Sequence, residues 1–124
     1  MNRAAVQLRR GVPSNMGREF AHPARPDCII VLPDDWLYEH EARRNEAIER
    51  AKELQLPDSW VGLSAAIALL DDWRDIPGLP ANPERWELGK MPIEVGEWLK
   101  QTAHEDFFKA FEVPKNSSPP LPNG

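Results

Sequence analysis

The stretch that most constrains this fold runs from Pro57 to Trp73 and reads P-D-S-W-V-G-L-S-A-A-I-A-L-L-D-D-W. Asp58 and Ser59 can accept hydrogen bonds from the free N–H groups of a first helical turn. Apolar residues follow at three- and four-residue steps, and small or apolar residues occupy most of the other sides. The pattern predicts a helix over residues 58–73 that the rest of the protein encloses.

Two amphipathic helices are predicted on either side of this stretch. Asp34 or Asp35 can cap a helix over residues 36–55, and Pro92 opens a helix over residues 92–111. The first of these has many charged residues and only a narrow stripe on one side, which predicts a surface helix packed against the central one. The stripe consists of Leu37, His40, Arg44, Ala47, Ile48, Ala51 and Leu54. Because the loop over residues 56–58 is short, the first two helices should be antiparallel neighbours.

A short extended segment is predicted before the helices. Consecutive β-branched residues lie within Cys28–Leu32, between Pro26 and Pro33. One strand cannot form a sheet by itself, so a partner is needed if the segment is a strand. The partner could be residues 4–8 or a strand of another subunit. The favoured interpretation is an apolar arm stretched across the helices.

Taken together, these patterns predict a mainly α protein, with one small three-helix domain over residues 28–112. A chain of 124 residues is long enough to bury roughly 65% of its unfolded surface in one modest core. Residues 1–27 are rich in arginine, proline and glycine, which predicts a basic flexible arm. Residues 113–124 read V-P-K-N-S-S-P-P-L-P-N-G and predict a disordered, proline-rich tail.

Charge and composition argue against several classes of binding partner and structural site. The net charge is −5, and residues 1–33 carry five arginines against two acids, so the remainder of the chain is strongly acidic. Such a body repels a nucleic-acid backbone, and nucleic-acid binding is not expected. Cys28 is the single cysteine, so a disulfide framework and a zinc pattern are not expected. The apolar runs are shorter than a membrane span, and a cytoplasmic protein without a membrane partner is expected.

One motif suggests metal chemistry. Asp71, Asp72 and Asp75 form D-D-x-x-D, and on a helix these positions could gather carboxylates around Mg²⁺. A solvated helix end is the favoured interpretation. Enzymes that use this motif need paired metal sites and a deep cavity, and this chain is too small to build them. His40-Glu41 and His104-Glu105 each lack the second histidine of a zincin motif. No catalytic residue, metal ligand or cofactor is therefore predicted, and a small metal-dependent enzyme remains a disfavoured alternative.

Aromatic residues provide the candidate site. Five tryptophans are too many to bury fully in so small a core, and partly exposed aromatic side chains are favoured anchors at protein interfaces. Phe107 and Phe108 diverge by about 100° around a helix, so Phe107 should join the apolar stripe and Phe108 should be an exposed anchor. The predicted protein-binding residues are Trp86, Trp98, Phe107, Phe108 and Phe111.

The C-terminal half resembles a family of small phage proteins. From Leu70 to Ser118 the chain reads L-L-D-D-W-R-D-I-P-G-L-P, then N-P-E-R-W-E-L, then P-I-E-V-G-E-W-L, then F-F-K-A-F-E-V-P-K-N-S-S. This layout resembles phage tail assembly chaperones. The resemblance implies a non-enzymatic protein of the host cell cytoplasm that binds tape-measure or tail-tube subunits before they polymerise, with homo-oligomerisation possible. A virion structural component and a small phage inhibitor of a host protein are alternatives.

Overall fold

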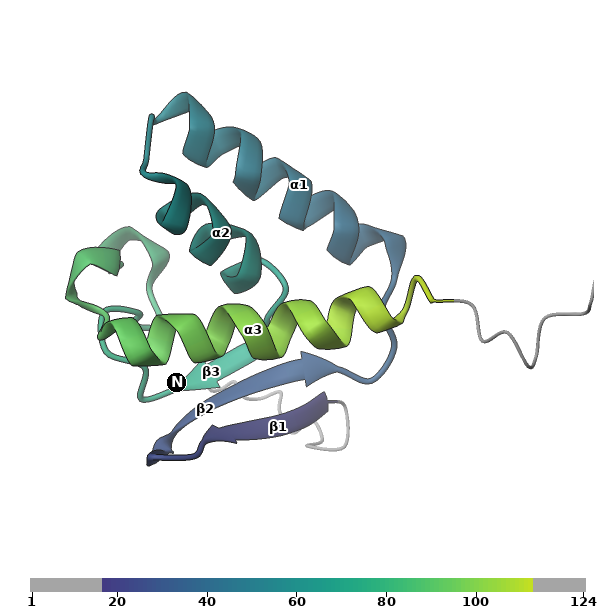
Figure 1. Ribbon diagram of the computed structural model, residues 1–124, viewed down its shortest axis with the longest axis horizontal. Coiled ribbons are helices and arrows are strands. Elements are labelled where there is room, and N and C mark those ends of the chain that lie inside the picture. The colour runs from purple at the N-terminus through teal and green to yellow at the C-terminus, as the bar shows by residue number, and fades with distance from the viewer. Residues whose placement is uncertain (1–16, 113–124) are drawn as a thin grey trace, which may run out of the picture.

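The structure is a computed structural model that describes residues 17–112, and it has an α+β fold. Helix α3 lies over a three-stranded antiparallel sheet, and the helices α1 and α2 lie on the other side of α3 (Figure 1). The expectation of a mainly α three-helix domain is therefore wrong. The elements are β1 (Gly17–His22), β2 (Arg25–Pro33), α1 (Tyr38–Glu53), α2 (Asp58–Ile67), β3 (Asp72–Arg74) and α3 (Ile93–Lys109), with short 3-10 turns at Pro83–Arg85 and Leu88–Lys90.

The sheet is built around β2, which contains the extended segment noticed in the sequence. Ile30 is paired with Phe20 of β1 on one side and with Trp73 of β3 on the other. Cys28, Ile30 and Leu32 are buried, whereas the residues between them are half-buried, so alternate side chains of β2 face the core. The apolar segment is thus a central strand and not an arm stretched across the helices.

Both neighbours of β2 come from segments for which other structures were expected. Residues 17–27, which were expected to belong to the flexible arm, instead form β1, the turn into β2 and the first residues of β2. The suggested strand at residues 4–8 lies outside the described residues, as do the rest of the arm and the proline-rich tail over 113–124. The sheet therefore forms within a single chain and needs no second subunit.

Helix α2 is shorter than the sequence predicted. It ends at Ile67 instead of continuing to residue 73, because the following residues turn into the sheet. The backbone N–H of Asp71 donates to the carbonyl of Val31 at 2.8 Å, and this bond begins the pairing of β3 with β2. The part of α2 that remains is enclosed as expected, with Leu63, Ala65, Ala66 and Ile67 buried.

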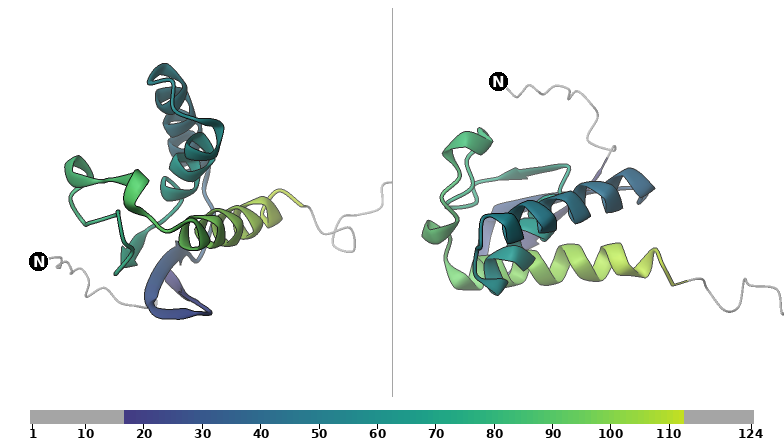
Figure 2. Two further views of the ribbon diagram at one scale, coloured as in Figure 1. Left: turned by 60° about the vertical axis from the view of Figure 1, so that its left-hand side comes forward. Right: turned by 90° about the horizontal axis from the view of Figure 1, so that it is seen from above.

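The other two helices lie close to their expected positions. Helices α1 and α3 fall within the ranges 36–55 and 92–111 and are a few residues shorter. Helices α1 and α2 lie side by side and run in opposite directions, as the short loop predicts (Figures 1 and 2). One face of α3 is fully buried between the sheet and the helical pair. Its buried side chains are Val95, Leu99, Ala103 and Phe107.

Candidate protein-binding surface

An aromatic cluster forms where α1 begins and α3 ends. It consists of Trp36, Phe107, Phe108 and Phe111. The ring centroids of Trp36 and Phe107 are 5.2 Å apart in an edge-to-face arrangement, and those of Phe107 and Phe111 are 5.1 Å apart. Such pairs add stabilisation beyond the area they bury. The cluster thus continues outward from the core along the end of α3 and the turn that follows it.

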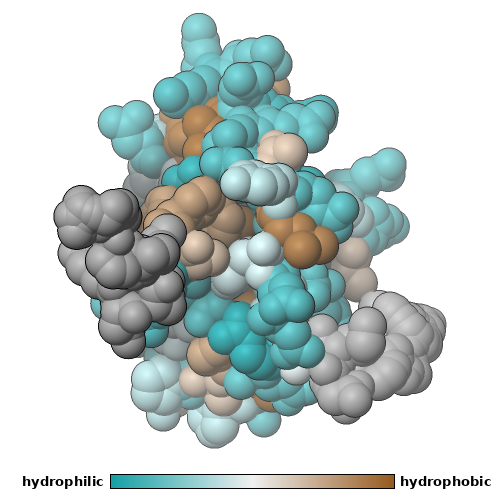
Figure 3. Space-filling view, turned by 90° about the vertical axis from the view of Figure 1, so that its right-hand side faces the viewer, coloured by the Kyte–Doolittle hydropathy of each residue, from teal (hydrophilic) through white to brown (hydrophobic). Residues whose placement is uncertain are grey.

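The two phenylalanines predicted to diverge do so. Phe107 is 2% exposed and belongs to the core, whereas Phe108 is 46% exposed and Phe111 is 49% exposed. Hydrophobic groups interrupt a mostly hydrophilic surface at this end of the molecule (Figure 3). Burial of Phe107 holds the helix in place, so the exposed rings are presented from a fixed position. A rigid aromatic ring loses little conformational entropy when it is buried by a partner.

Arg44 and His104 attach α1 to this part of α3. The rings of His104 and Phe108 are stacked, with centroids 5.6 Å apart. The guanidinium carbon of Arg44 lies 5.2 Å from the centroid of the Phe108 ring and 5.8 Å from that of Phe107. These distances are within the range of cation–π attraction. A cation therefore lies beside the half-exposed Phe108 ring.

His104 is neutral in this arrangement. Its Nε2 accepts a hydrogen bond from Nε of Arg44 at 3.0 Å, so its Nδ1 carries the proton and donates to the carbonyl of Lys100 at 3.1 Å. Burial is the main factor that lowers the pKa of His104, and the positive charge of Arg44 lowers it further. Burial also lowers the pKa of Arg44, which is only partly offset by Glu41.

Sequence reasoning did not identify Arg44 or His104 as site residues. The sequence does contain a signal for Arg44. This arginine is the one fully charged residue in the otherwise mostly apolar stripe of the helix predicted over 36–55. A cation in such a stripe either has a partner on a neighbouring element or covers apolar surface with its stem. The partner is 60 residues away in the chain, so the pairing was not visible.

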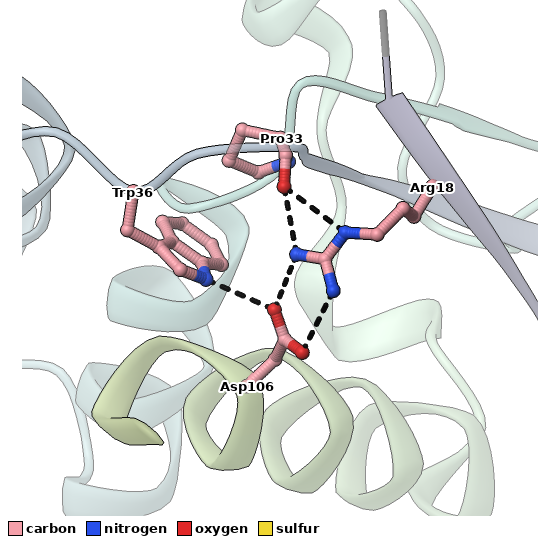
Figure 4. Close-up of polar contacts among 4 residues, drawn as sticks. All are labelled: Arg18, Pro33, Trp36 and Asp106. Atoms are coloured by element: carbon pink, nitrogen blue, oxygen red, sulfur yellow. Dashed lines mark hydrogen bonds and ion pairs between the residues drawn. The ribbon is translucent and has the colours of Figure 1, made fainter. Parts of the chain in front are cut away.

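A polar network behind the cluster holds Trp36 (Figure 4). Arg18 of β1 donates to both carboxylate oxygens of Asp106 and, from two of its nitrogens, to the carbonyl of Pro33. The indole Nε1 of Trp36 donates to Asp106 at 2.9 Å. The hydrogen bonds from Arg18 are the main factor that lowers the pKa of Asp106. Strand β1, the segment before α1 and the end of α3 are thus joined at one carboxylate.

The two predicted tryptophans lie apart from this cluster. Trp86 packs edge-on against Trp73, with ring centroids 5.9 Å apart, and its Nε1 donates to the carbonyl of Pro80 at 3.0 Å. Trp98 packs edge-on against His22 of β1, at 5.1 Å. Both are partly buried against the core. They seal its margin, and only Phe107, Phe108 and Phe111 of the five predicted residues come together.

The aspartate motif does not have the geometry that metal binding would require. Asp72 lies in β3 and Asp75 has a positive φ of 54°, so the three carboxylates are not on successive turns of a helix. Within residues 17–112 no group of three or more potential ligand side chains is close enough to hold a metal ion. His40 is buried, and its Nδ1 accepts from the backbone N–H of Leu37 at 2.9 Å, which is a structural role.

A shallow hollow lies between the beginnings of α2 and α3, lined in part by Trp60, Met91 and Ile93. It holds about 80 Å³ of accessible space, far below the roughly 300–1,000 Å³ of small-molecule sites. The aromatic cluster is therefore the better candidate site.

Comparison of the chain with models of protein families, with curated proteins and with solved structures finds no match. In the described part of the chain, no helix combines the length and the apolarity needed to cross a membrane.

Proposed function

We propose that this protein is a non-enzymatic phage tail assembly chaperone, acting in the host cell cytoplasm. In this role it binds tape-measure or tail-tube subunits before they polymerise. The observation that carries the proposal is the exposure of Phe108 and Phe111 at the end of a well-anchored helix. The class of partner comes from the resemblance of residues 70–118 to that family.

The physical requirements of such a role agree with the surface. A chaperone for an assembling subunit must offer apolar anchors to a segment that would otherwise aggregate, while remaining soluble itself. Phe108 and Phe111 are suitable anchors, because aromatic residues often dominate interface energetics. The net charge of −5 disfavours self-association at neutral pH.

The proposal is tested by co-expressing the chain with any tape-measure and tail-tube proteins that its genome encodes, and capturing the complex. Phe108→Ala should lose most of the captured subunit, because truncating a central aromatic anchor costs at least ~2 kcal/mol of binding, roughly 30-fold in affinity. Its melting temperature should stay close to that of the parent protein, because the ring is only half-buried.

The matched control is Ile93→Ala, which removes an even more exposed apolar side chain at the opposite end of α3. This variant should retain the subunit. Equal retention by both variants would contradict the proposed surface, and capture of a host protein in place of a tail subunit would favour an inhibitor.

A further inference from the structure

We propose that the aromatic cluster binds an amphipathic segment of a partner protein that carries a side-chain carboxylate close to its apolar anchor, and that Arg44 binds this carboxylate. The inference rests on the proposed function, since it names the chemistry of the segment that the cluster binds. Phe108 and Phe111 would receive the apolar anchor, and the guanidinium beside them would receive the charge.

Arg44 has unused hydrogen-bonding capacity. Its Nε donates to His104, and the structure gives the guanidinium no other acceptor among residues 17–112. In the same part of the chain, the arginines of the three strands are paired, Arg18 with Asp106, Arg25 with Glu94 and Arg74 with Glu19, whereas Arg43, Arg50 and Arg85 are in no ion pair. No ion pair of the described residues includes Arg44.

Arg44 is held in position. The stacked pair of His104 and Phe108 lies on one side of it, and Phe107 is also within cation–π distance. Because His104 accepts the Nε–H, the orientation of the guanidinium plane is restricted, and the terminal nitrogens remain available. A planar guanidinium fixed in this way suits bidentate binding of a carboxylate, which is directional and stronger than a bond between neutral groups.

A carboxylate of the partner would complement the charge of Arg44 over a short distance. Arg44 is partly buried and loses hydration, and the negative charge of Glu41 only partly offsets that loss. A carboxylate delivered by a partner would compensate for that loss at the same time as the partner covers Phe108. A partner with apolar anchors alone would bury the cation further without compensation, so it should bind more weakly.

The test uses a displayed library of random peptides of about 16 residues, long enough for roughly four helical turns. The library is selected against the full-length protein and counter-selected against Phe108→Ala. Selected peptides should combine apolar residues with Asp or Glu within one helical turn. Each is then synthesised with that acid and with Asn or Gln in its place, and both forms are titrated against the parent protein and against Arg44→Gln and Arg44→Lys.

The acidic form should bind the parent protein about tenfold more tightly than the amide form, as expected for a charge-assisted bidentate pair. Arg44→Gln should abolish that difference, and Arg44→Lys should retain part of it, because lysine keeps the charge but not the planar fork. The acid-to-amide comparison on the parent protein does not depend on how any variant folds.

The outcomes separate the two proposals. Peptides that depend on Phe108 but bind equally well in acidic and amide forms would overturn the role of Arg44 and leave the apolar surface intact. A selection that yields no peptide dependent on Phe108 would overturn the proposed surface and, with it, this inference.

Discussion

At the scale of single residues, Asp106 has more structural partners than its position near the end of a helix suggests. Its carboxylate accepts from Arg18 and from Trp36, which come from strand β1 and from the segment before α1. The Asp106 side chain is only 18% exposed, whereas that of Arg18 is 39% exposed. The ion pair is therefore partly shielded from water on the side of the carboxylate. Asp106 therefore couples the outer strand of the sheet to the aromatic cluster.

We expect Asp106→Ala to lower the free energy of unfolding by about 1.5–3 kcal/mol, the range for hydrogen bonds to a charged group. The measurement is urea denaturation followed by tryptophan fluorescence. Glu94→Ala is the matched control, since it removes the exposed ion pair with Arg25 and should cost less than about 1 kcal/mol. Equal costs for the two variants would show that Asp106 is not a structural junction.

At the scale of elements, β2 is the part of the molecule on which the others depend. It pairs with strands on both sides, and its inward face packs against α3. Consecutive isoleucines on this strand have different environments: Ile30 is fully buried, whereas Ile29 is half-buried on the opposite face. They provide a matched pair of the same residue type.

Ile30→Ala should lower the free energy of unfolding by about 2–5 kcal/mol, because it leaves a cavity in the core. Ile29→Ala should cost about 1 kcal/mol, since water can reach the vacated space. Thermal unfolding of both variants followed by circular dichroism gives the comparison. If the two variants had similar melting temperatures, β2 would not have the orientation described.

At the scale of the whole molecule, stability should depend on pH through His104. Burial and Arg44 lower its folded-state pKa below the ordinary value of 6.5. The unfolded chain therefore binds a proton between these two pKa values, while the folded protein does not. It follows that the free energy of unfolding falls as the pH falls from 6.5 toward the lowered pKa, and that the full stability is present above 6.5.

The check is to measure urea midpoints between about pH 8 and about pH 5 for the parent protein and for His104→Gln, which can make the same two hydrogen bonds without titrating. The difference between the two profiles isolates His104 from the other histidines. The parent protein should lose more stability than the variant over this interval. Parallel profiles would contradict a neutral, buried His104.

Asp106 affects the free energy of unfolding in a lower range of pH than His104 does. Its folded-state pKa is lowered below 3.8, so its contribution is present above that value and is lost as the pH falls through the lowered pKa.

The sequence by itself determined the features that depend on neighbours along the chain. The approximate ranges of α1 and α3 follow from caps and helical periodicity, and the contrast between buried Phe107 and exposed Phe108 follows from their angular separation on one helix. The extended character of β2 follows from its β-branched residues. Each of these signals lies within a few residues of the feature that it predicts.

Only the tertiary structure decided the sheet and the charged part of the candidate site. Asp72 and Trp73 continue the helical pattern of the preceding residues, and their place in β3 depends on hydrogen bonds to β2, about forty residues earlier in the chain. Residues 17–22 have little strand signal of their own and become β1 by pairing with the same strand. Arg44 and His104 meet only because the fold brings these side chains of α1 and α3 within hydrogen-bond distance. Strand pairing and side-chain partnership are interactions between distant segments, and local propensity contains no information about which segments will meet.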